Sequence, residues 1–331
     1  MGKSPGWRRW LRGLISVGLL VWLIQWIDWR EFGRLAAGFE YQWGLAASLI
    51  FVINILMTSY KWGILLRAKG LVYPWSRLVR IVWVGNFLGI FLPTSLGGDN
   101  VRMVSIVRAG SPPAVAISSV IMERVSGMST LGALAVLGGL WSAAHGQRPE
   151  LLLMIVLPAS IVVVGLLLLW SEPGYRLVRW ITGRLHRLPG QRLLVDTHDA
   201  LRTYDQARPA LATVFAVSLV TQFLRVAFVL LIARGFGIRP PLLEATALIP
   251  TALFLGALPI SVGGWGVREG AFVLVLGFIG IGRDAAFGIS LISRAAGLLA
   301  HLPGLAIYLR EGLGRRPAGG DEDDGGRSKT D

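Results

Sequence analysis

Long apolar stretches, separated by short polar or basic segments, run along the whole 331-residue chain. Several reach the roughly 20 apolar residues that a helix needs to cross a bilayer. The stretches cover residues 11–27, 41–66, 78–96, 114–141, 151–170, 211–233, 242–259 and 285–309. This pattern predicts an all-α polytopic membrane protein. No small-residue cleavage site follows the first stretch, so we expect it to be a retained helix rather than a signal peptide.

Two of the stretches end in a similar polar motif. LPTSLGGDNVR begins at Leu92, and LPISVGGWGVR begins at Leu258. Proline lacks a backbone N–H and glycine tolerates turn conformations, so each motif interrupts its helix. The turns are predicted at Pro93, Gly97 and Gly98 in the first copy, and at Pro259, Gly263 and Gly264 in the second.

The distribution of basic residues indicates that these two stretches turn back instead of crossing. If every stretch crossed, the segment 171–208, with seven arginines, would lie outside, against the positive-inside bias. With re-entrant hairpins at 78–96 and 242–259, the inside segments 1–12, 61–80, 171–208 and 310–331 hold 21 Lys and Arg. The outside loops then hold five. Both termini are predicted to be cytoplasmic, in the cytoplasmic (inner) membrane.

The same topology relates two halves of the chain. Repeat 1 covers about 41–141 and repeat 2 about 209–309, and their later helices carry RVSG from Arg124 and RAAG from Arg294. The repeats start on opposite sides, which predicts an inverted repeat with about six full spans and two re-entrant helical hairpins. We expect one transmembrane domain over 1–310, with a cytoplasmic interfacial linker at 171–208. The tail 311–331 is predicted to be disordered.

Composition narrows the function. The chain is 53% hydrophobic and 16% charged, with a net charge of +14. Because the basic residues flank predicted spans and no loop is long enough for a folded basic domain, we expect no nucleic-acid partner. With no cysteine, the chain has no disulfide, thiol nucleophile or cysteine metal site. No cofactor or metal is expected.

Ionisable groups at membrane depth are the candidate functional residues. When the two polar motifs are aligned, Arg102 matches Arg268, and the later Arg-x-x-Gly motifs match Arg124 with Arg294. The acids do not match: Asp99 aligns with Trp265, Glu269 with Met103 and Glu123 with Ser293. Four positive groups facing three negative ones favour an anionic ligand, and a phosphate suits the planar fork of arginine.

The predicted roles follow from these residue types. Substrate binding is assigned to Arg102, Arg124, Arg268, Arg294, Asn86, Ser95 and Ser261. Coupling or gating is assigned to Asp99, Glu123 and Glu269. The structural alternative is that the arginines snorkel to an interface and the acids form ion pairs with them. Arg225 and His301 have no counterpart in a motif, and for them packing roles are predicted.

The motifs NFLGIFLPTSLGGDNVR, ERVSG, LPISVGGWGVREG and SRAAGLLAHLPGLAIYL, in this order, resemble the lysylphosphatidylglycerol synthase transmembrane family of flippase-like proteins. The resemblance covers about residues 10–310. It implies an inner-membrane protein that moves an anionic or aminoacylated phospholipid between leaflets. The soluble aminoacyltransferase domain of the bifunctional synthases is expected to be absent, so lysine transfer is not assigned.

These observations favour a lipid translocase for an anionic or phosphate-bearing lipid, such as an anionic phospholipid or a polyprenyl phosphate. The absence of a Walker A motif means that an ion gradient or downhill movement must supply the energy. Two alternatives stay open. One is a membrane-embedded glycosyl- or lipid-group transferase that uses Asp99 or Glu123 as a base. The other is a non-catalytic subunit of a lipid-synthesis complex.

Overall fold

The structure, a computed structural model, describes residues 27–91, 97–144, 191–257 and 264–311, together with positions 25, 160, 164, 172–174, 176, 177, 180 and 261. Helices form the regular elements of this part of the chain, which confirms the prediction of an all-α membrane protein. Among the described residues, four helical segments are long and apolar enough to cross a bilayer: Tyr41–Arg67, Pro113–Gly138, Arg192–Gly235 and Arg283–Glu311. The predicted spans at 11–27 and 151–170 lie almost entirely outside the described residues, so the total of six spans stays a prediction.

The chain begins its described part with a short surface helix, α2 (Trp29–Ala37). Asp28 caps this helix, because its carboxylate accepts the backbone N–H groups of Arg30 and Glu31. The other elements are α3 (Tyr41–Arg67), α4 (Trp75–Phe91), α5 (Gly97–Arg108), α6 (Pro113–Ala144), α9 (Gln191–Arg202), η1 (Thr203–Ala207), α10 (Arg208–Gly235), α11 (Leu242–Ala257), α12 (Val267–Gly277) and α13 (Arg283–Glu311).

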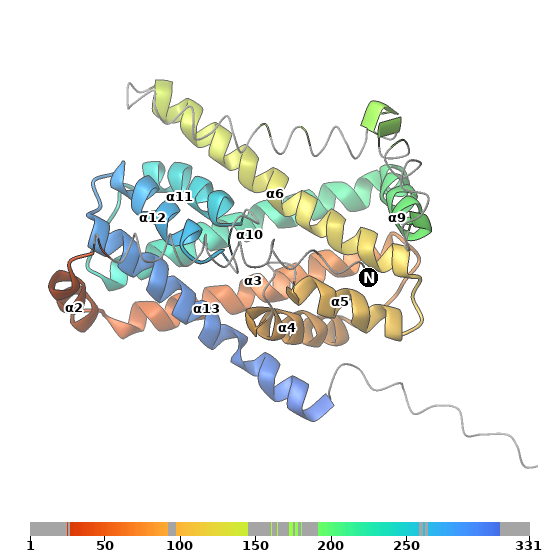
Figure 1. Cartoon of the computed structure of the whole chain (residues 1–331), viewed down its shortest axis with the longest axis horizontal. Coiled ribbons are helices and arrows are strands. Elements are labelled where there is room, and N and C mark those ends of the chain that lie inside the picture. The colour runs from red at the N-terminus through yellow and green to blue at the C-terminus, as the bar shows by residue number, and fades with distance from the viewer. Residues whose placement is uncertain are drawn as a thin grey trace, which may run out of the picture.

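Figure 1 shows two sets of helices that run in opposite directions. α3 runs from the end of the molecule that carries α2 towards the end that carries α9, and α6 returns. In the second set, α10 runs from the α9 end towards the α2 end, and α13 returns. In the sequence, a pair of shorter helices lies between the two long helices of each set: α4 and α5 in the first, and α11 and α12 in the second. The arrangement is the inverted order that arginine counting predicts.

The short helices form hairpins whose outer ends meet. The hydroxyl of Tyr73, before α4, lies 2.7 Å from that of Ser111, after α5. In the second hairpin, the ring of Phe236, before α11, lies against Gly288 near the start of α13, the helix that follows α12. Each hairpin therefore enters and leaves at the same end of the molecule, as a re-entrant segment must.

Glycines allow the two helices of the first hairpin to approach closely. A Cβ on Gly98 would lie 2.7 Å from the carbonyl oxygen of Gly85, and a Cβ on Gly89 would lie 2.9 Å from Gly98 N. Gly97 and Gly98 are not turn residues, contrary to the prediction: both lie in the first turn of α5. Their function is close helix packing rather than chain reversal. The predicted turn residues Pro93, Pro259 and Gly263 lie outside the described residues.

The backbone shows how the two halves correspond. After α5, Ser111 N donates to Ile106 O over 3.1 Å, and after α12, Ile281 N donates to Leu276 O over 3.2 Å. The same loops contain Gly110 and Gly280, with φ values of 94° and 79°. After the hairpin tips, equivalent residues of the two halves are therefore 170 positions apart in the sequence. Before the hairpins the spacing is 167, because Gly70 and Gly237 occupy equivalent turns with φ values of 74° and 71°.

The change in spacing arises around the tips. Five residues separate α4 from α5 and nine separate α11 from α12, while α11 is one residue shorter than α4, which gives the net change of three. The similar motifs therefore occupy different structures: GGDNVR lies within α5, whereas Gly264 and Gly266, with φ values of 75° and 82°, belong to a turn before α12. An alignment of the two motifs letter by letter is thus not an alignment of the helices that follow them.

Each hairpin also packs against the last helix of the other half. Trp83 on α4 donates its indole N–H to the carbonyl oxygen of Ala300 on α13 over 2.9 Å. A Cβ on Gly304 would collide with Trp83 O, so α13 crosses α4 in close contact. In the same way α11 packs against α6. The two halves are interlocked, and a buried cluster that includes Val229, Ile249 and Phe272 supports the second half.

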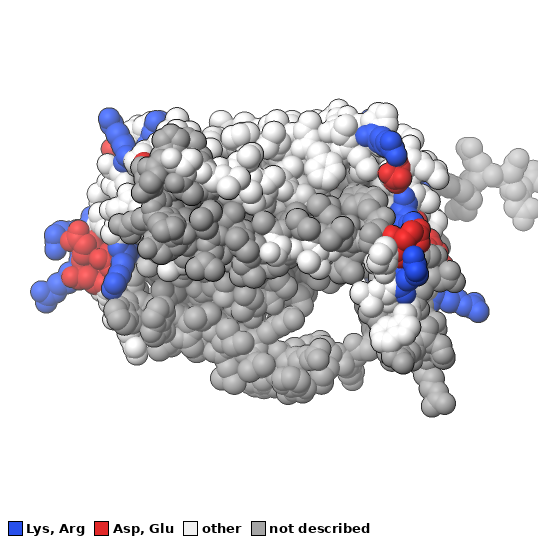
Figure 2. Space-filling view, turned by 90° about the horizontal axis from the view of Figure 1, so that it is seen from above, with Lys and Arg blue, Asp and Glu red and all other residues white. Residues whose placement is uncertain are grey.

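Charged side chains gather at the two ends of the molecule, with an uncharged band between them in the part of the surface that Figure 2 shows. At one end, Arg80 pairs with Glu311 over 2.7 Å, and Lys69 hydrogen-bonds to Thr203. At the other end, Asp28 N donates to Asp284 over 2.9 Å. An uncharged band between two charged ends is the distribution expected of a protein that spans a bilayer.

Candidate functional site

Ion pairs within the helix bundle form two clusters, one in each half. The first cluster consists of Lys61, Asp99, Arg102, Glu123 and Arg124. The second consists of the ion pair between Glu269 and Arg294, with Trp265, which stacks on Arg294, and Arg268, which precedes Glu269 in the sequence. In each half, the cluster joins the first turns of a short hairpin helix to the middle of a long helix beside it, and the inverted repeat places these elements in both halves.

Glu123 on α6 is the centre of the first cluster. Its two carboxylate oxygens accept from different cations: Oε1 lies 2.7 Å from Lys61 Nζ, and Oε2 lies 3.1 Å from Arg102 Nη1. Lys61 and Arg102 are only 2% and 3% exposed. Removing one partner of such a buried pair leaves an uncompensated charge and costs about 3–5 kcal/mol.

Asp99 on α5 completes the first cluster. It pairs with Arg124 through Nε and lies 3.4 Å from Arg102 Nη1. The guanidinium of Arg102 also lies 4.5 Å from the ring centroid of Trp62, in a cation–π contact. Arg102 is therefore held by two carboxylates and an aromatic ring, and its charge is largely compensated.

Lys61 is the member of this cluster that sequence reasoning missed. It was counted among the cytoplasmic basic residues of 61–80, but the structure buries it among α3, α6 and α10. Its ammonium group also donates to Ser218 Oγ over 3.2 Å and to Glu123 O over 3.4 Å. The available indication was its place inside the apolar run 41–66, before that run ends.

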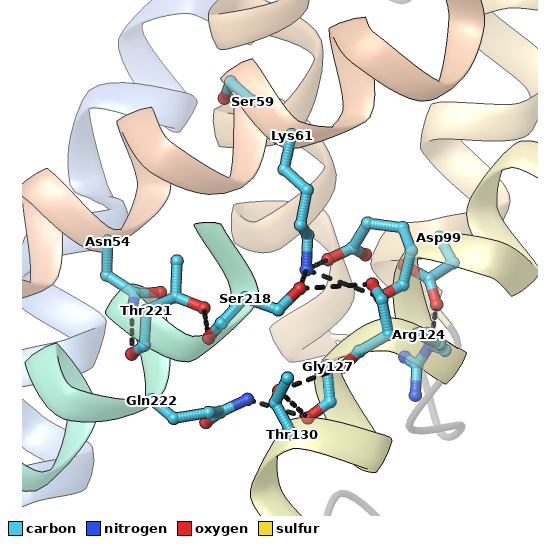
Figure 3. Close-up of polar contacts among 12 residues, drawn as sticks. Asn54, Ser59, Lys61, Asp99, Arg124, Gly127, Thr130, Ser218, Thr221 and Gln222 are labelled. Atoms are coloured by element: carbon cyan, nitrogen blue, oxygen red, sulfur yellow. Dashed lines mark hydrogen bonds and ion pairs between the residues drawn. The ribbon is translucent and has the colours of Figure 1, made fainter. Parts of the chain in front are cut away.

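Neutral hydrogen bonds join the same three helices below Lys61 (Figure 3). Ser218 donates to Ser126 Oγ over 3.2 Å, Gln222 Nε2 donates to Gly127 O over 2.9 Å, and Asn54 Nδ2 donates to Thr221 O over 2.9 Å. These side chains come from all three helices. The bonds fix α3, α6 and α10 relative to one another, so the charges on α6 are held in place.

Glu269 on α12 is the centre of the second cluster. It is 0% exposed, accepts Gly266 N over 2.7 Å and pairs with Arg294 Nη2 over 2.9 Å. The guanidinium of Arg294 lies 3.9 Å from the ring centroid of Trp265. Glu269 thus stabilises the start of its own helix and neutralises an arginine of α13.

The two clusters share one ion pair in equivalent positions. In Asp99–Arg124 and in Glu269–Arg294, the acid precedes the arginine by the same number of positions. The two pairs also have the spacing of 170 that the turns at Gly110 and Gly280 give for the helices themselves. The prediction that the acids break the symmetry is therefore wrong for Asp99 and Glu269.

The four extra residues of the second tip also displace one of the predicted arginine matches. The motif alignment pairs Arg102 with Arg268, but their positions along α5 and α12 differ by these four residues. Arg124 and Arg294, on the long helices, keep their predicted correspondence. The two hairpins therefore present their arginines at different points.

Arg268 on α12 differs from Arg102 in its surroundings as well. No carboxylate lies within ion-pair distance of it among the described residues, and its Nε is buried without a hydrogen-bond partner. Its guanidinium lies 5.4 Å from the ring centroid of Phe272. Of the four predicted substrate-binding arginines, Arg268 is thus the one that forms no ion pair with a carboxylate among the described residues.

The structure separates the remaining predicted residues. Asn86 is half-buried on α4, and Ser261 is buried with a hydroxyl that has no partner in the described part of the chain. His301 packs edge-on against Phe51, with ring centroids 5.1 Å apart. Ser95 lies outside the described residues. Asn86 and His301 are therefore not members of either cluster as defined by the ion pairs.

The charges at membrane depth leave a positive surplus. The two clusters, together with Arg225 on α10, hold six cationic groups against three carboxylates. The cations are Lys61, Arg102, Arg124, Arg225, Arg268 and Arg294; the carboxylates are Asp99, Glu123 and Glu269. Because an uncompensated charge is costly in a bilayer, this surplus favours an anionic ligand. No group of three side chains suited to hold a metal ion occurs among the described residues.

A family profile described as Lysylphosphatidylglycerol synthase TM region matches residues 9–304, which is most of the chain. A sequence comparison with curated proteins gives no match. The family match spans both hairpins, both clusters and nearly all of the long helices described above.

Proposed function

Because the chain belongs to the family of the lysylphosphatidylglycerol synthase transmembrane region, a multi-pass membrane family tied to lipid metabolism or transport, we propose that it translocates an anionic or phosphate-bearing lipid. The observation that carries the proposal is the positive surplus inside an inverted repeat of hairpins. Inverted repeats with interrupted helices are a transporter architecture, in which the substrate binds near the middle of the membrane.

The two equivalent ion pairs supply a mechanism. A lipid phosphate competes with Asp99 for Arg124 when the headgroup is near the first hairpin, and with Glu269 for Arg294 when it is near the second. Each carboxylate reclaims its arginine when the phosphate leaves, so neither arginine is left uncompensated. Glu123, held by two buried cations, has the coupling or gating role in the first half.

The orientation follows from the distribution of basic residues. The end with α9 carries Lys69, Arg77, Arg80 and Arg310, and we place it in the cytoplasm of a cell with this protein in its cytoplasmic membrane. Both termini are then cytoplasmic. A single cysteine at Arg239, at the α2 end, is expected to react with a membrane-impermeant thiol reagent from outside the cell, and one at Arg77 is not. The chain has no native cysteine to interfere.

A liposome assay tests the proposal. The purified full chain is reconstituted with a trace of phosphatidylglycerol that carries a fluorophore on one acyl chain, and a reductant outside the liposomes bleaches the outer leaflet. Wild-type protein is expected to let the inner pool reach the outside, and Arg268→Ala is expected to slow it at least about tenfold, because a charge-assisted hydrogen bond is lost.

Arg239→Ala is the matched control. It removes the same charge at an exposed position outside α10 and is expected to leave the rate unchanged. Wild-type liposomes that bleach no faster than empty ones, with phosphatidylglycerol, phosphatidic acid and polyprenyl phosphate alike, would sink the translocase proposal.

A further inference from the structure

The five charged residues of the first cluster form a chain in which cations and carboxylates alternate. In order of contact, the members are Arg124, Asp99, Arg102, Glu123 and Lys61. The chain begins on α6, passes through α5, returns to α6 and ends on α3. With three cations and two carboxylates, it carries one net positive charge, which an anionic ligand would neutralise.

Arg124 is the member of this chain that a ligand can reach most easily. Its side chain is 36% exposed, whereas those of Asp99 and Glu123 are 11% and 12% exposed. The side chains of Lys61 and Arg102 are buried. A phosphate that enters the first half therefore meets Arg124, and it competes there with the carboxylate of Asp99 (Figure 3).

The contact between Asp99 and Arg102 is the loosest of the chain. Oδ1 of Asp99 lies 3.4 Å from Nη1 of Arg102, which is longer than the roughly 2.7–2.9 Å of a charge-assisted hydrogen bond. The Nε and Nη2 groups of Arg102 are buried and have no hydrogen-bond partner among the described residues. Because Asp99 precedes Arg102 by three positions on α5, both side chains lie on one face of this helix. Arg102 thus has unused donors beside a carboxylate that Arg124 holds.

Lys61 keeps those donors of Arg102 available. Glu123 binds Arg102 through one oxygen only: its Oε2 lies 3.1 Å from Nη1, the nitrogen that also faces Asp99. Its other oxygen, Oε1, lies 2.7 Å from Lys61 Nζ. Because Lys61 occupies this second oxygen, Glu123 holds Arg102 in place without occupying Nε and Nη2.

We propose that Asp99 changes partner when the ligand binds: a phosphate takes Arg124, and the carboxylate of Asp99 moves to the unused donors of Arg102. Arg102 is then a positioning residue, which receives the displaced carboxylate and does not touch the phosphate. Without this second cation, the displaced carboxylate would be a buried charge without a partner, which is costly. When the phosphate leaves, Asp99 returns to Arg124.

This partner exchange rests on the proposed function, from which it takes a phosphate as the ligand. It departs from the sequence prediction, which assigned Arg102 to the substrate. It is also a property of the first half. In the second half, Glu269 accepts Gly266 N over 2.7 Å and pairs with Arg294, and no second cation lies within ion-pair distance of it among the described residues.

Equilibrium binding to the purified full chain in a neutral detergent tests the exchange. The probes are dihexanoyl phosphatidylglycerol and inorganic phosphate. Asp99→Asn removes the competitor for Arg124, so it is expected to lower Kd at least about tenfold, the worth of a charge-assisted hydrogen bond. Arg102→Gln removes the cation that receives Asp99, so it is expected to raise Kd at least about tenfold. Shifts for both probes assign the site to a phosphate of either source, and shifts for the lipid alone assign it to a lipid headgroup.

The double variant separates partner exchange from direct contact. Once Asp99 is asparagine, no carboxylate has to move to Arg102, so adding Arg102→Gln should leave Kd within about threefold of the Asp99→Asn value. Direct contact between Arg102 and the phosphate predicts the same loss in both backgrounds instead. Arg102→Lys, which keeps a cation for Asp99, should restore most of the affinity that Arg102→Gln loses.

Two exposed positions provide matched controls. Asp205 faces Arg208, three positions later, over 3.9 Å, so Asp205→Asn removes a carboxylate from the same kind of pair at the surface. Arg239→Gln removes an exposed arginine. Neither change should shift Kd. A loss of stability alone does not tighten binding, so the lowered Kd of Asp99→Asn is a result that a purely structural role would not produce.

Three results would overturn the exchange. They are a Kd in Asp99→Asn no lower than that of wild type, a loss from Arg102→Gln that persists in full when Asp99 is asparagine, and wild-type protein that binds neither probe. If Arg102→Gln cannot be purified folded, the Kd of Asp99→Asn decides alone. A protein that shows these shifts but moves no lipid in liposomes would refute the proposed function and leave the exchange intact. A protein that moves lipid without these shifts would do the reverse.

Discussion

The ion pair between Lys61 and Glu123 allows a quantitative test of the first cluster. Glu123 neutralises Lys61 at 2.7 Å and Arg102 at 3.1 Å, so Glu123→Gln strands the buried Lys61 and leaves Arg102 with Asp99 alone, at 3.4 Å. Lys61→Met strands none, because Glu123 keeps Arg102. Breaking a buried pair costs about 3–5 kcal/mol, and roughly 2 °C of melting temperature is lost per kcal/mol for a chain of this size. We therefore expect Glu123→Gln to melt roughly 6–10 °C below wild type, and Lys61→Met to lose about half as much.

The double variant makes the test specific to the pair. Once Lys61 is methionine, Glu123→Gln no longer strands a lysine, so the combined loss should be smaller than the sum by about 1–3 kcal/mol. The assay is thermal unfolding of the purified full chain in detergent, with the two single variants and the double variant measured side by side. Arg239→Gln, an exposed charge removal, should shift the midpoint by less than ~1 °C. Strictly additive losses would refute the geometry of this cluster.

Three further predictions concern other parts of the molecule. Gly98→Ala should melt about 2–6 °C below wild type, because its Cβ would lie 2.7 Å from Gly85 O. Gly33→Ala, whose Cβ would have no atom within 4 Å, should not melt lower. Equal melting temperatures of the two variants would contradict the close packing of α4 and α5. Asp99→Asn and Glu269→Gln should slow translocation by similar factors in the liposome assay, since they break equivalent ion pairs, and a full effect from only one of them would argue against the equivalence. Burial lowers the pKa of Lys69, which follows the end of α3, to about 8 from 10.5. Its acylation rate, followed by peptide mass spectrometry, should therefore reach half its maximum near pH 8, and a midpoint above pH 10 would contradict this. Because the folded state binds this proton less tightly than the unfolded chain does, the same group favours folding more as the pH rises from 8 towards 10.5.

The sequence predicted the helices and hairpins because their causes are local or one-dimensional. Apolar length determines which segments can span a bilayer, and the excess of arginine in 171–208 excludes a topology in which every stretch crosses. The hairpins found at α4–α5 and α11–α12 are the two stretches that this count selects. Arg124 and Arg294 were also matched correctly, because their spacing of 170 is that of the helices that carry them.

The site was harder to predict, because it depends on how turns and helices pack. The two motifs share letters, but Gly97 and Gly98 begin α5 whereas Gly264 and Gly266 lie in a turn before α12, and only the helix bounds show the four extra residues in the second tip. That shift hid the equivalence of Asp99 with Glu269. Burial of Lys61 was not predicted, because a basic residue near the end of an apolar run is normally interpreted as one that flanks a membrane span.

Charge selectivity in wild-type liposomes tests the central claim most directly. The rates at which acyl-labelled phosphatidylglycerol and phosphatidylcholine leave the inner leaflet are measured in the same preparation, with protein and lipid otherwise identical. Transport through an arginine site predicts a ratio well above one, which falls towards one in Arg268→Ala and stays at the wild-type value in Arg239→Ala. A ratio of one in the wild-type protein would contradict the account.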